Sequence, residues 1–329
     1  MPSRTPEGAL FDLLSFARHG PGRRDRLSPA ELHQIARTVR RTPEVMIKVL
    51  PRGANDLAAV RKHLDYIGRK GKVELETDDG QRVQGAGVGE ELLSDWDLDL
   101  EERRSKSDLV ARPGKSSPRL VHKLMFSMPA GAPPDMVLLA VRNFLREEFA
   151  LKHRYAMALH TDEPHPHVHV VLKAVSEQGE RLHIRKATLR EWRAGFAWHL
   201  RAVGAAANAT QRHVRGEVTP RKSDGIYRAT RRGESTHMRE RAASLARDLV
   251  NGDISVESGK AKLVETRKEV RRAWQAVSAI LIREGQPDLS AQVRRFAEQM
   301  PPPMTEREWM ATKLAQRPRD PRERGNSTR

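Results

Sequence analysis

Four of the chain's 13 histidines fall within residues 160–169, which read HTDEPHPHVH. Successive side chains of a strand point to opposite faces, so His167 and His169 are expected on one face of the apolar run that follows them. His160 ends the preceding run, and a hairpin through the Asp-Glu-Pro connection would return it beside the other two. Three imidazoles would then converge and leave coordination positions open, as in a catalytic metal site. The alternative is a turn with exposed histidines that bind nothing.

Composition limits the class of partner. The chain has 60 Lys and Arg against 43 Asp and Glu, a net charge of +17 and a pI of about 10.6. This balance favours a polyanion, with nucleic acid ahead of an anionic membrane. The chain lacks Cys, which excludes disulfides and thiolate metal sites. It shows no signal-peptide pattern and no apolar run of transmembrane length, so we expect a cytoplasmic protein without membrane insertion.

Strand and helix patterns alternate through the middle of the chain. The order is strand, helix, strand, helix, three strands and a helix, which predicts an α+β fold with an antiparallel sheet and helices on one face. The histidines are expected on central strands. Residues 78–118 look like a long polar loop with a helical piece near 90–95. Strands are predicted at 45–50 (a central strand), 120–128, the two histidine segments and 181–184, and helices at about 55–67, 136–149 and 189–203.

The flanking regions lack strand patterns. Ser28-Pro29-Ala30-Glu31 is typical of a helix start with a capping box. Helical spacing returns near 237–250, 259–283, 289–299 and 305–315. We therefore predict a helical extension at 1–43, a central domain at 44–216, a helical C-terminal region at 217–316 and a disordered basic tail at 317–329.

A basic groove beside a metal suggests phosphate chemistry, which needs a nucleophile. Of the three tyrosines, Tyr66 is the best candidate, because it lies near the end of a predicted helix and precedes Arg69, Lys70 and Lys72. These cations could hold DNA phosphates on either side of the attacked bond. Periodicity alone favours the alternative, in which Tyr66 is an ordinary amphipathic-helix residue.

Three segments together resemble a known family. Residues 64–75, LDYIGRKGKVEL, are similar to the catalytic-tyrosine motif of VirD2-like conjugative relaxases of the mobilisation class, within the HUH endonucleases. The histidine segment resembles the metal-binding motif of that family, and residues 126–131, FSMPAG, resemble its Ser-x-Pro-Ala-Gly segment. The resemblance covers about residues 44–216, roughly half of the chain. Residues 1–43 have no counterpart in it.

The resemblance implies a reaction and its residues. Tyr66 would attack one phosphodiester of single-stranded DNA at a transfer origin and keep the 5′ end as a phosphotyrosine. His160, His167 and His169 would hold a divalent ion, Mg or Mn. Three imidazoles intrinsically prefer a later transition metal, so we expect Mn²⁺ to bind more tightly than Mg²⁺. No nucleotide cofactor is needed, because the ester conserves the bond energy.

The resemblance also assigns supporting residues and partners. Ser127 becomes a candidate DNA contact, and Asp162 either orients a ligating imidazole or accepts the tyrosine proton, unless it only caps a turn. His165, between two prolines, is expected to point away. His122 is expected on the face opposite Ser127, in a structural role or as a distal DNA contact. Expected partners are an accessory nicking protein and a type IV coupling protein. Residues 1–43 are expected either to cover the DNA groove or to bind the accessory protein, and the C-terminal helices to bind the coupling protein or the secretion channel.

Two rival functions remain open. A rolling-circle initiator or single-strand transposase shares the histidine motif, but in most of these the tyrosine follows it, whereas Tyr66 precedes it. The other rival is a non-enzymatic nucleic-acid-binding protein whose histidines are incidental or hold a structural zinc. The Arg-rich tail resembles a translocation signal and is equally consistent with an ordinary solvated tail.

Overall fold

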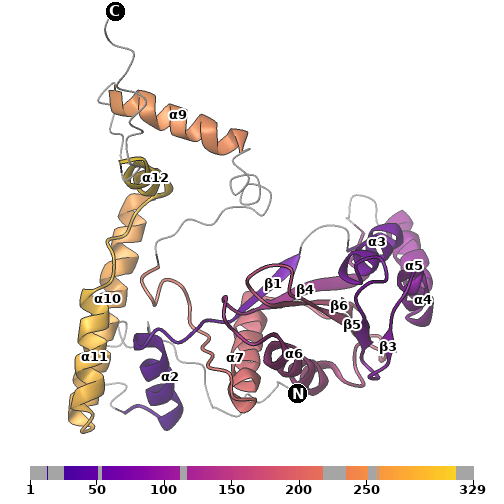
Figure 1. The fold of residues 1–329 in the computed structure, drawn as a ribbon, viewed down its shortest axis with the longest axis horizontal. Helices are drawn as coiled ribbons and strands as arrows, with labels where there is room; N and C mark the ends of the chain where they lie inside the picture. The colour runs from indigo at the N-terminus through magenta and orange to yellow at the C-terminus, as the bar shows by residue number, and fades with distance from the viewer. Residues whose placement is uncertain are drawn as a thin grey trace, which may run out of the picture. The chain divides into compact units, whose positions relative to one another are not determined.

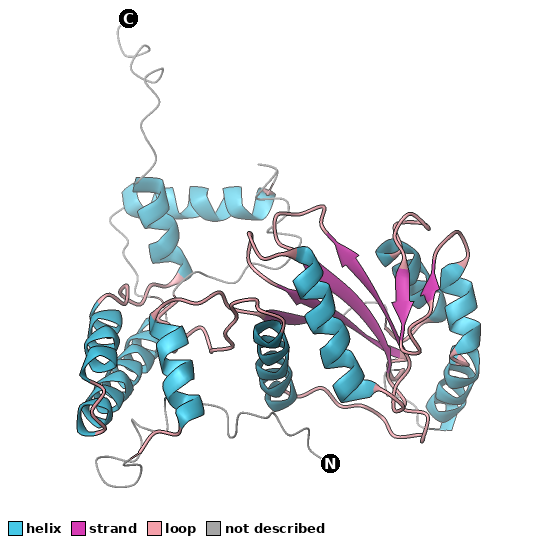
Figure 2. Ribbon diagram, turned by 60° about the horizontal axis from the view of Figure 1, so that its bottom comes forward, coloured by secondary structure: helices cyan, strands magenta, loops and turns pink. Residues whose placement is uncertain are grey.

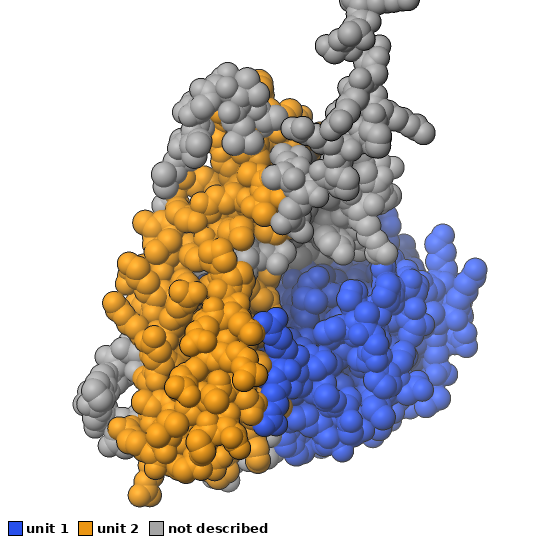
Figure 3. All heavy atoms as spheres, turned by 60° about the vertical axis from the view of Figure 1, so that its left-hand side comes forward, with its two compact units in different colours: residues 1–10, 40–209 blue, residues 11–39, 210–329 orange. Residues whose placement is uncertain are grey.

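The computed structural model describes residues 13, 26–50, 54–111, 117–217, 235–250, 257 and 259–315. The chain divides into two compact units (Figure 3). The first comprises Met1–Leu10 with Arg40–Ala209, and the second Phe11–Val39 with Thr210–Arg329. The basic tail predicted at 317–329 lies outside the described residues. Among the described residues, no helix is both long and apolar enough to cross a membrane.

Within the described part of the first unit, six strands form one antiparallel sheet in the order β1-β4-β6-β5-β2-β3 (Figure 2). The predicted antiparallel α+β fold, followed by a helical C-terminal region, is confirmed. β6 and β5 lie in the interior of the sheet, so the histidine strands are central as predicted. The strands are β1 (Met46–Leu50), β2 (Leu75–Thr77), β3 (Arg82–Val83), β4 (Val121–Ser127), β5 (Tyr155–His160) and β6 (His167–Lys173).

One face of the sheet packs against α6 (Pro134–Phe149) and α7 (Lys186–Ala202), which lie below the sheet in Figure 1. Phe126 of β4 contacts Phe144 of α6 and Phe196 of α7, with ring centroids 5.4 and 5.3 Å apart. Every second residue of the central strands points into the same core, because successive side chains of a strand point to opposite faces. This is a helix layer that the sequence predicts, but the prediction of helices on one face alone was wrong, because helices also pack on the other face.

The other face carries a second apolar cluster. α3 (Leu57–Ile67) and α4 (Val88–Asp95) pack there, and the fully buried Val60 and Leu64 of α3 anchor the helix. Beneath them the central strands present Ala156, Ala158 and Val171. Small side chains let a helix approach a sheet closely. The histidines share this face, because they alternate with the residues of the first core.

Three local predictions were wrong. β1 is an edge strand that pairs only with β4 among the described strands. The region 78–118 holds β3, α4 and a further helix, α5 (Leu98–Ala111), rather than a long loop, and only the helical piece expected near 90–95 is confirmed, by α4. The α5 sequence is polar on all sides, so periodicity gave no signal. The strand expected at 181–184 is a single bridge between Val175 and Arg181.

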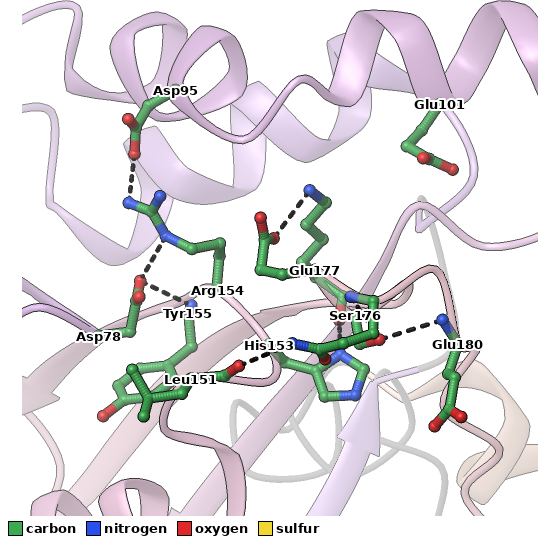
Figure 4. Close-up of polar contacts among 12 residues, drawn as sticks. Asp78, Asp95, Glu101, Leu151, His153, Arg154, Tyr155, Ser176, Glu177 and Glu180 are labelled. Atoms are coloured by element: carbon green, nitrogen blue, oxygen red, sulfur yellow. Dashed lines mark hydrogen bonds and ion pairs between the residues drawn. The ribbon is translucent and has the colours of Figure 1, made fainter.

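A polar network joins the elements at the end of the sheet away from the histidines (Figure 4). The Arg154 guanidinium donates to Asp78, next to β2, at 3.0 Å and to Asp95, at the end of α4, at 2.5 Å. Asp78 also accepts the backbone N–H of Tyr155 at 3.2 Å. These contacts fix the start of β5, and hence the register that carries His160.

The described part of the second unit is helical. Its helices are α2 (Pro29–Val39), α9 (Thr236–Val250), α10 (Lys260–Arg283), α11 (Pro287–Glu298) and α12 (Glu306–Ala315). The four predicted C-terminal helices are confirmed. Ser28 and Glu31 form the predicted capping box of α2. Ile35 of α2 packs in one core with Trp274, whose indole N–H donates to the carbonyl of Val214 at 3.0 Å.

Candidate active site

The β5–β6 hairpin brings the three histidines together. His160 and His167 are direct partners across the two strands, and His169 lies two residues further along β6 on the same face. One ring nitrogen from each of the three lies within 4.8 Å of the others. The predicted convergence is therefore confirmed. His165 is not part of this group; it is exposed in the connection.

Hydrogen bonds fix the orientation of two of these rings. The Nε2–H of His160 donates to the carbonyl of Ile67 at 2.7 Å, because a carbonyl oxygen can only accept. His160 Nδ1 is then the acceptor for the Arg69 guanidinium at 3.2 Å. Likewise the Nδ1–H of His167 donates to the carbonyl of His165 at 3.0 Å. The ring nitrogens without a proton are thus His167 Nε2 and His160 Nδ1, the second of which accepts from Arg69. A ligating histidine commonly has its other nitrogen bonded as an N–H donor in this way.

Electrostatics also suit a metal. Burial lowers the pKa of His160. Burial, reinforced by the charges of His160 and His167, lowers the pKa of His169 to about 3. Neutral imidazole is the form that binds a cation, so these groups need lose no proton at neutral pH. The three residues fit a divalent ion, although imidazole ligands do not by themselves identify it.

Tyr66 lies beside the triad. Its ring centroid is 5.9 Å from that of His169 and 6.3 Å from that of His160. The tyrosine side chain is 43% exposed, so the hydroxyl-bearing ring is open to a substrate. The helix that carries it begins at Asp56, whose carboxylate accepts the N–H of Ala59 at 3.0 Å, and ends at Gly68. The helix predicted at about 55–67 is confirmed.

Comparison with known proteins agrees with this geometry. Residues 66–197 match the family model of the MobA/VirD2-like relaxase nuclease domain. This segment is therefore similar to a relaxase nuclease domain. It contains the histidine triad and Tyr66, and it implies a DNA substrate and an enzyme that nicks it. Searches of curated proteins and of solved structures gave no match.

The turn after Tyr66 directs the side chain of Arg69 back towards the histidine triad. Arg69, Lys70 and Gly71 have φ angles of 51°, 55° and 84°, a left-handed run that reverses the chain. The guanidinium of Arg69 lies 5.1 Å from the centroid of the Tyr66 ring and pairs with the carboxylate of Asp162. Lys70 and Lys72 are exposed on the same turn. Of the three predicted phosphate contacts, Arg69 is therefore the one that lies within the site.

Asp162 reaches the triad indirectly. Its carboxylate pairs with the same Arg69 nitrogen that donates to His160. Partial burial is the largest single influence and opposes ionisation of Asp162, but the charges of Arg69, His160 and His167 and a backbone hydrogen bond together lower the pKa of the carboxyl. An ionised Asp162 can therefore hold the guanidinium in place beside His160.

The remaining sequence candidates divide between the two faces of the sheet. Ser127 lies in one row with His167 and His160, but its hydroxyl is buried and donates to the carbonyl of Met128 at 3.4 Å. His122 lies on the opposite face, as predicted, where its Nε2 donates to the carbonyl of Leu182 at 3.0 Å. That buried bond indicates a structural role.

Of the other two tyrosines, only Tyr155 lies among the described residues. Tyr155 also lies on the opposite face in the main core, and burial raises its pKa to about 12. It therefore cannot reach the triad. Tyr227 lies outside the described residues.

His63 is the residue that sequence reasoning missed. It lies one helical turn before Tyr66, and the two rings stack with centroids 5.9 Å apart and planes 17° apart. Its ring also meets that of His169 at 6.1 Å, nearly perpendicular. Burial, followed by the charges of Lys123 and His160, lowers the pKa of His63 to about 4, so it is neutral at physiological pH. Its spacing of three residues from Tyr66 was the available signal.

Proposed function

We propose that this chain is a site- and strand-specific DNA relaxase that nicks a transfer origin by tyrosine transesterification. The single observation that carries the proposal is the position of Tyr66, exposed and 5.9 Å from His169, beside three imidazoles that offer nitrogens within 4.8 Å of one another. A nucleophile next to an open cation site is the arrangement that phosphoryl transfer requires. We propose that the domain extends over residues 44–216.

The reaction balances without a nucleotide cofactor. The Tyr66 oxygen bonds to phosphorus as the bond from phosphorus to the 3′ oxygen breaks. The phenol loses its proton and the released 3′ oxygen gains one, so the products are a 5′-phosphotyrosine and a 3′ hydroxyl. A later attack by a 3′ hydroxyl reverses the exchange and rejoins the strand.

The chain's own residues hold the reactants. His160, His167 and His169 would bind Mg²⁺ or Mn²⁺, which when bound neutralises charge on the attacked phosphate. Arg69 lies over the Tyr66 ring, where its positive charge favours the developing phenolate. Asp162 positions Arg69, while Lys70, Lys72 and Ser127 are proposed DNA contacts on either side of the attacked bond. The wider role is conjugative transfer from a bacterial cytoplasm, with an accessory nicking protein and a type IV coupling protein as partners.

The test uses single-stranded DNA tiled across a transfer origin, incubated with the full chain and Mn²⁺. Denaturing gels should show a protein–DNA adduct that survives boiling in detergent. We expect Tyr66→Phe and chelator each to abolish the adduct. Tyr155→Phe is the matched control, because it removes a phenol from the opposite face of the same sheet and should leave the adduct intact.

Three results would change the proposal. Tight binding without an adduct on any fragment would support a non-enzymatic DNA-binding protein. An adduct that persists in Tyr66→Phe would keep the chemistry and move the nucleophile elsewhere. Nicking at a replication origin in place of a transfer origin would support the rolling-circle alternative.

A further inference from the structure

The three triad histidines are not equally supported. His160 and His167 each donate their second ring N–H to a backbone carbonyl. In His169 the Nδ1 atom is buried and has no hydrogen-bond partner among the described residues. A buried ring nitrogen without a hydrogen-bond partner destabilises the fold. A ligating histidine normally has this atom bonded, which fixes the ring for the metal.

A second unpartnered nitrogen lies next to it. The Nε2 of His63 is also buried without a partner in the described part of the chain. The ring of His63 meets the ring of His169 at a centroid distance of 6.1 Å and an angle of 77°. Two unsatisfied buried nitrogens on adjoining rings thus lie between α3 and the sheet.

A third polar group borders the same space. Lys123 of β4 is buried on this face of the sheet, and its ammonium donates to the carbonyl of Ala59 in α3 at 3.3 Å. Ala59 lies one helical turn before His63 on α3, and the Lys123 charge lowers the pKa of His63. A buried water generally makes about three hydrogen bonds, so these groups offer a suitable set of partners.

We infer that His63 is a positioning residue for His169, joined to it through one buried water molecule. The Nδ1–H of His169 donates to the water oxygen, and the water donates to Nε2 of His63. His169 then presents Nε2 to the cation. This inference rests on the proposed metal site. All three histidines then have the same arrangement. One ring nitrogen faces the metal, and the other donates its N–H to a hydrogen-bond acceptor.

The same ring links the ligand to the nucleophile. His63 stacks on Tyr66 while its edge faces His169. A displaced His63 ring would therefore have two effects. Loss of its Nε2 as an acceptor would weaken metal binding at His169, and loss of its stacking would change the position of the Tyr66 ring. The two effects can be separated, because a phenyl ring replaces the plane but not the nitrogen.

The experiment is a titration of Mn²⁺ into the full chain without DNA, followed by calorimetry and by electron paramagnetic resonance of the bound ion. His63→Phe should weaken Mn²⁺ binding about tenfold or more, the usual effect of losing an outer hydrogen-bond partner. His63→Gln carries an amide at the depth of Nε2 and should restore most of the affinity. His63→Asn, one methylene shorter, should not.

Two control variants leave the bonding of the ligands unchanged. Tyr66→Phe should keep full Mn²⁺ affinity while it abolishes the adduct. His33→Phe, an exposed position on α2 of the other unit, should change neither. A thermal melt of each variant shows whether it has folded. If His63→Phe does not fold, the comparison of Mn²⁺ affinity between His63→Gln and His63→Asn tests the inference instead.

Equal Mn²⁺ affinity in wild type and folded His63→Phe would overturn the inference and leave the proposed relaxase intact. Gln and Asn variants that bind equally would also overturn it, because the position of the nitrogen would then be irrelevant. A wild-type chain that binds no Mn²⁺ by either method would instead remove the metal site, and the inference with it.

Discussion

Gly71 is the position at which one added methyl group should disturb the site most. Its φ is +84°, and an added Cβ would lie 2.5 Å from the carbonyl carbon of Gly85 and 2.7 Å from its oxygen. Backbone atoms cannot rotate away as a side chain can. The turn must therefore move, and it carries Arg69, whose guanidinium reaches Asp162 and His160.

The cost of Gly71→Ala has two parts. A left-handed conformation costs a residue with a Cβ about 1–2 kcal/mol. Forcing atoms into filled space costs about 1–3 kcal/mol more. The sum is about 2–5 kcal/mol in the free energy of unfolding. At about 2–4 °C per kcal/mol for a domain of this size, the melting temperature should fall by about 4–20 °C.

Gly80→Ala is the matched control. Gly80 has the same φ of +84°, but its added Cβ would meet only the end of the Arg146 side chain, at 3.8 Å. We expect this variant to lose only the conformational part, about 1–2 kcal/mol. Chemical denaturation gives both free energies, and the adduct assay should show a loss for Gly71→Ala alone. Equal destabilisation of the two variants would refute the reasoning, because the contact with Gly85 would then have no consequence.

Three further predictions follow from packing, burial and metal binding. Ala158→Leu should overpack the space between β5 and α3 and lower the free energy of unfolding, measured by chemical denaturation, by about 1–3 kcal/mol. It should also slow adduct formation more than it weakens DNA binding, and unchanged adduct kinetics would contradict this prediction. Burial lowers the pKa of His122 to about 4, against 6.5 in the unfolded chain. The unfolded chain therefore takes up a proton first as the pH falls, so the contribution of His122 to folding stability is complete above pH 6.5 and is lost between pH 6.5 and 4. Between pH 7 and 5 His122 should thus account for about 2 kcal/mol of acid destabilisation, and His122→Phe should show that much less in urea titrations. Mn²⁺ at about 100 times its dissociation constant should stabilise the fold by about 2.7 kcal/mol, an effect that a melt of His167→Ala should not show.

The histidine site was predictable because its information is local. His160, His167 and His169 occupy one hairpin, and the two-residue repeat of a strand fixes which side chains share a face. The capping residue Asp56 and the helix end at Gly68 are local signals of the same kind. From these signals the hairpin and the helix that carries Tyr66 followed directly.

The missed features depend on packing across the chain. An edge strand and a central strand have similar apolar sequences, so the sequence alone did not reveal that β1 lies at the edge of the described sheet, paired with β4. Helix α5 has no apolar stripe to detect. The spacing of His63 from Tyr66 was visible in the sequence, but its contact with His169 was not, because that contact joins positions 106 residues apart in sequence. The turn that folds Arg69 back towards His160 is likewise a property of backbone geometry that residue types do not reveal.

Helix α2 gives the chain an unusual order of assembly. The N–H of Leu27, just before this helix, donates to the Glu284 carboxylate, a partner 257 residues later in sequence. At about 5–20 residues per second, a ribosome would need roughly 13–50 s to make that partner after Leu27 has been added. During this interval the sheet and its helices can fold, while the apolar side of α2, with Ile35, still lacks its core. The nascent amino-terminal segment is therefore a natural target for chaperones until the final helices emerge.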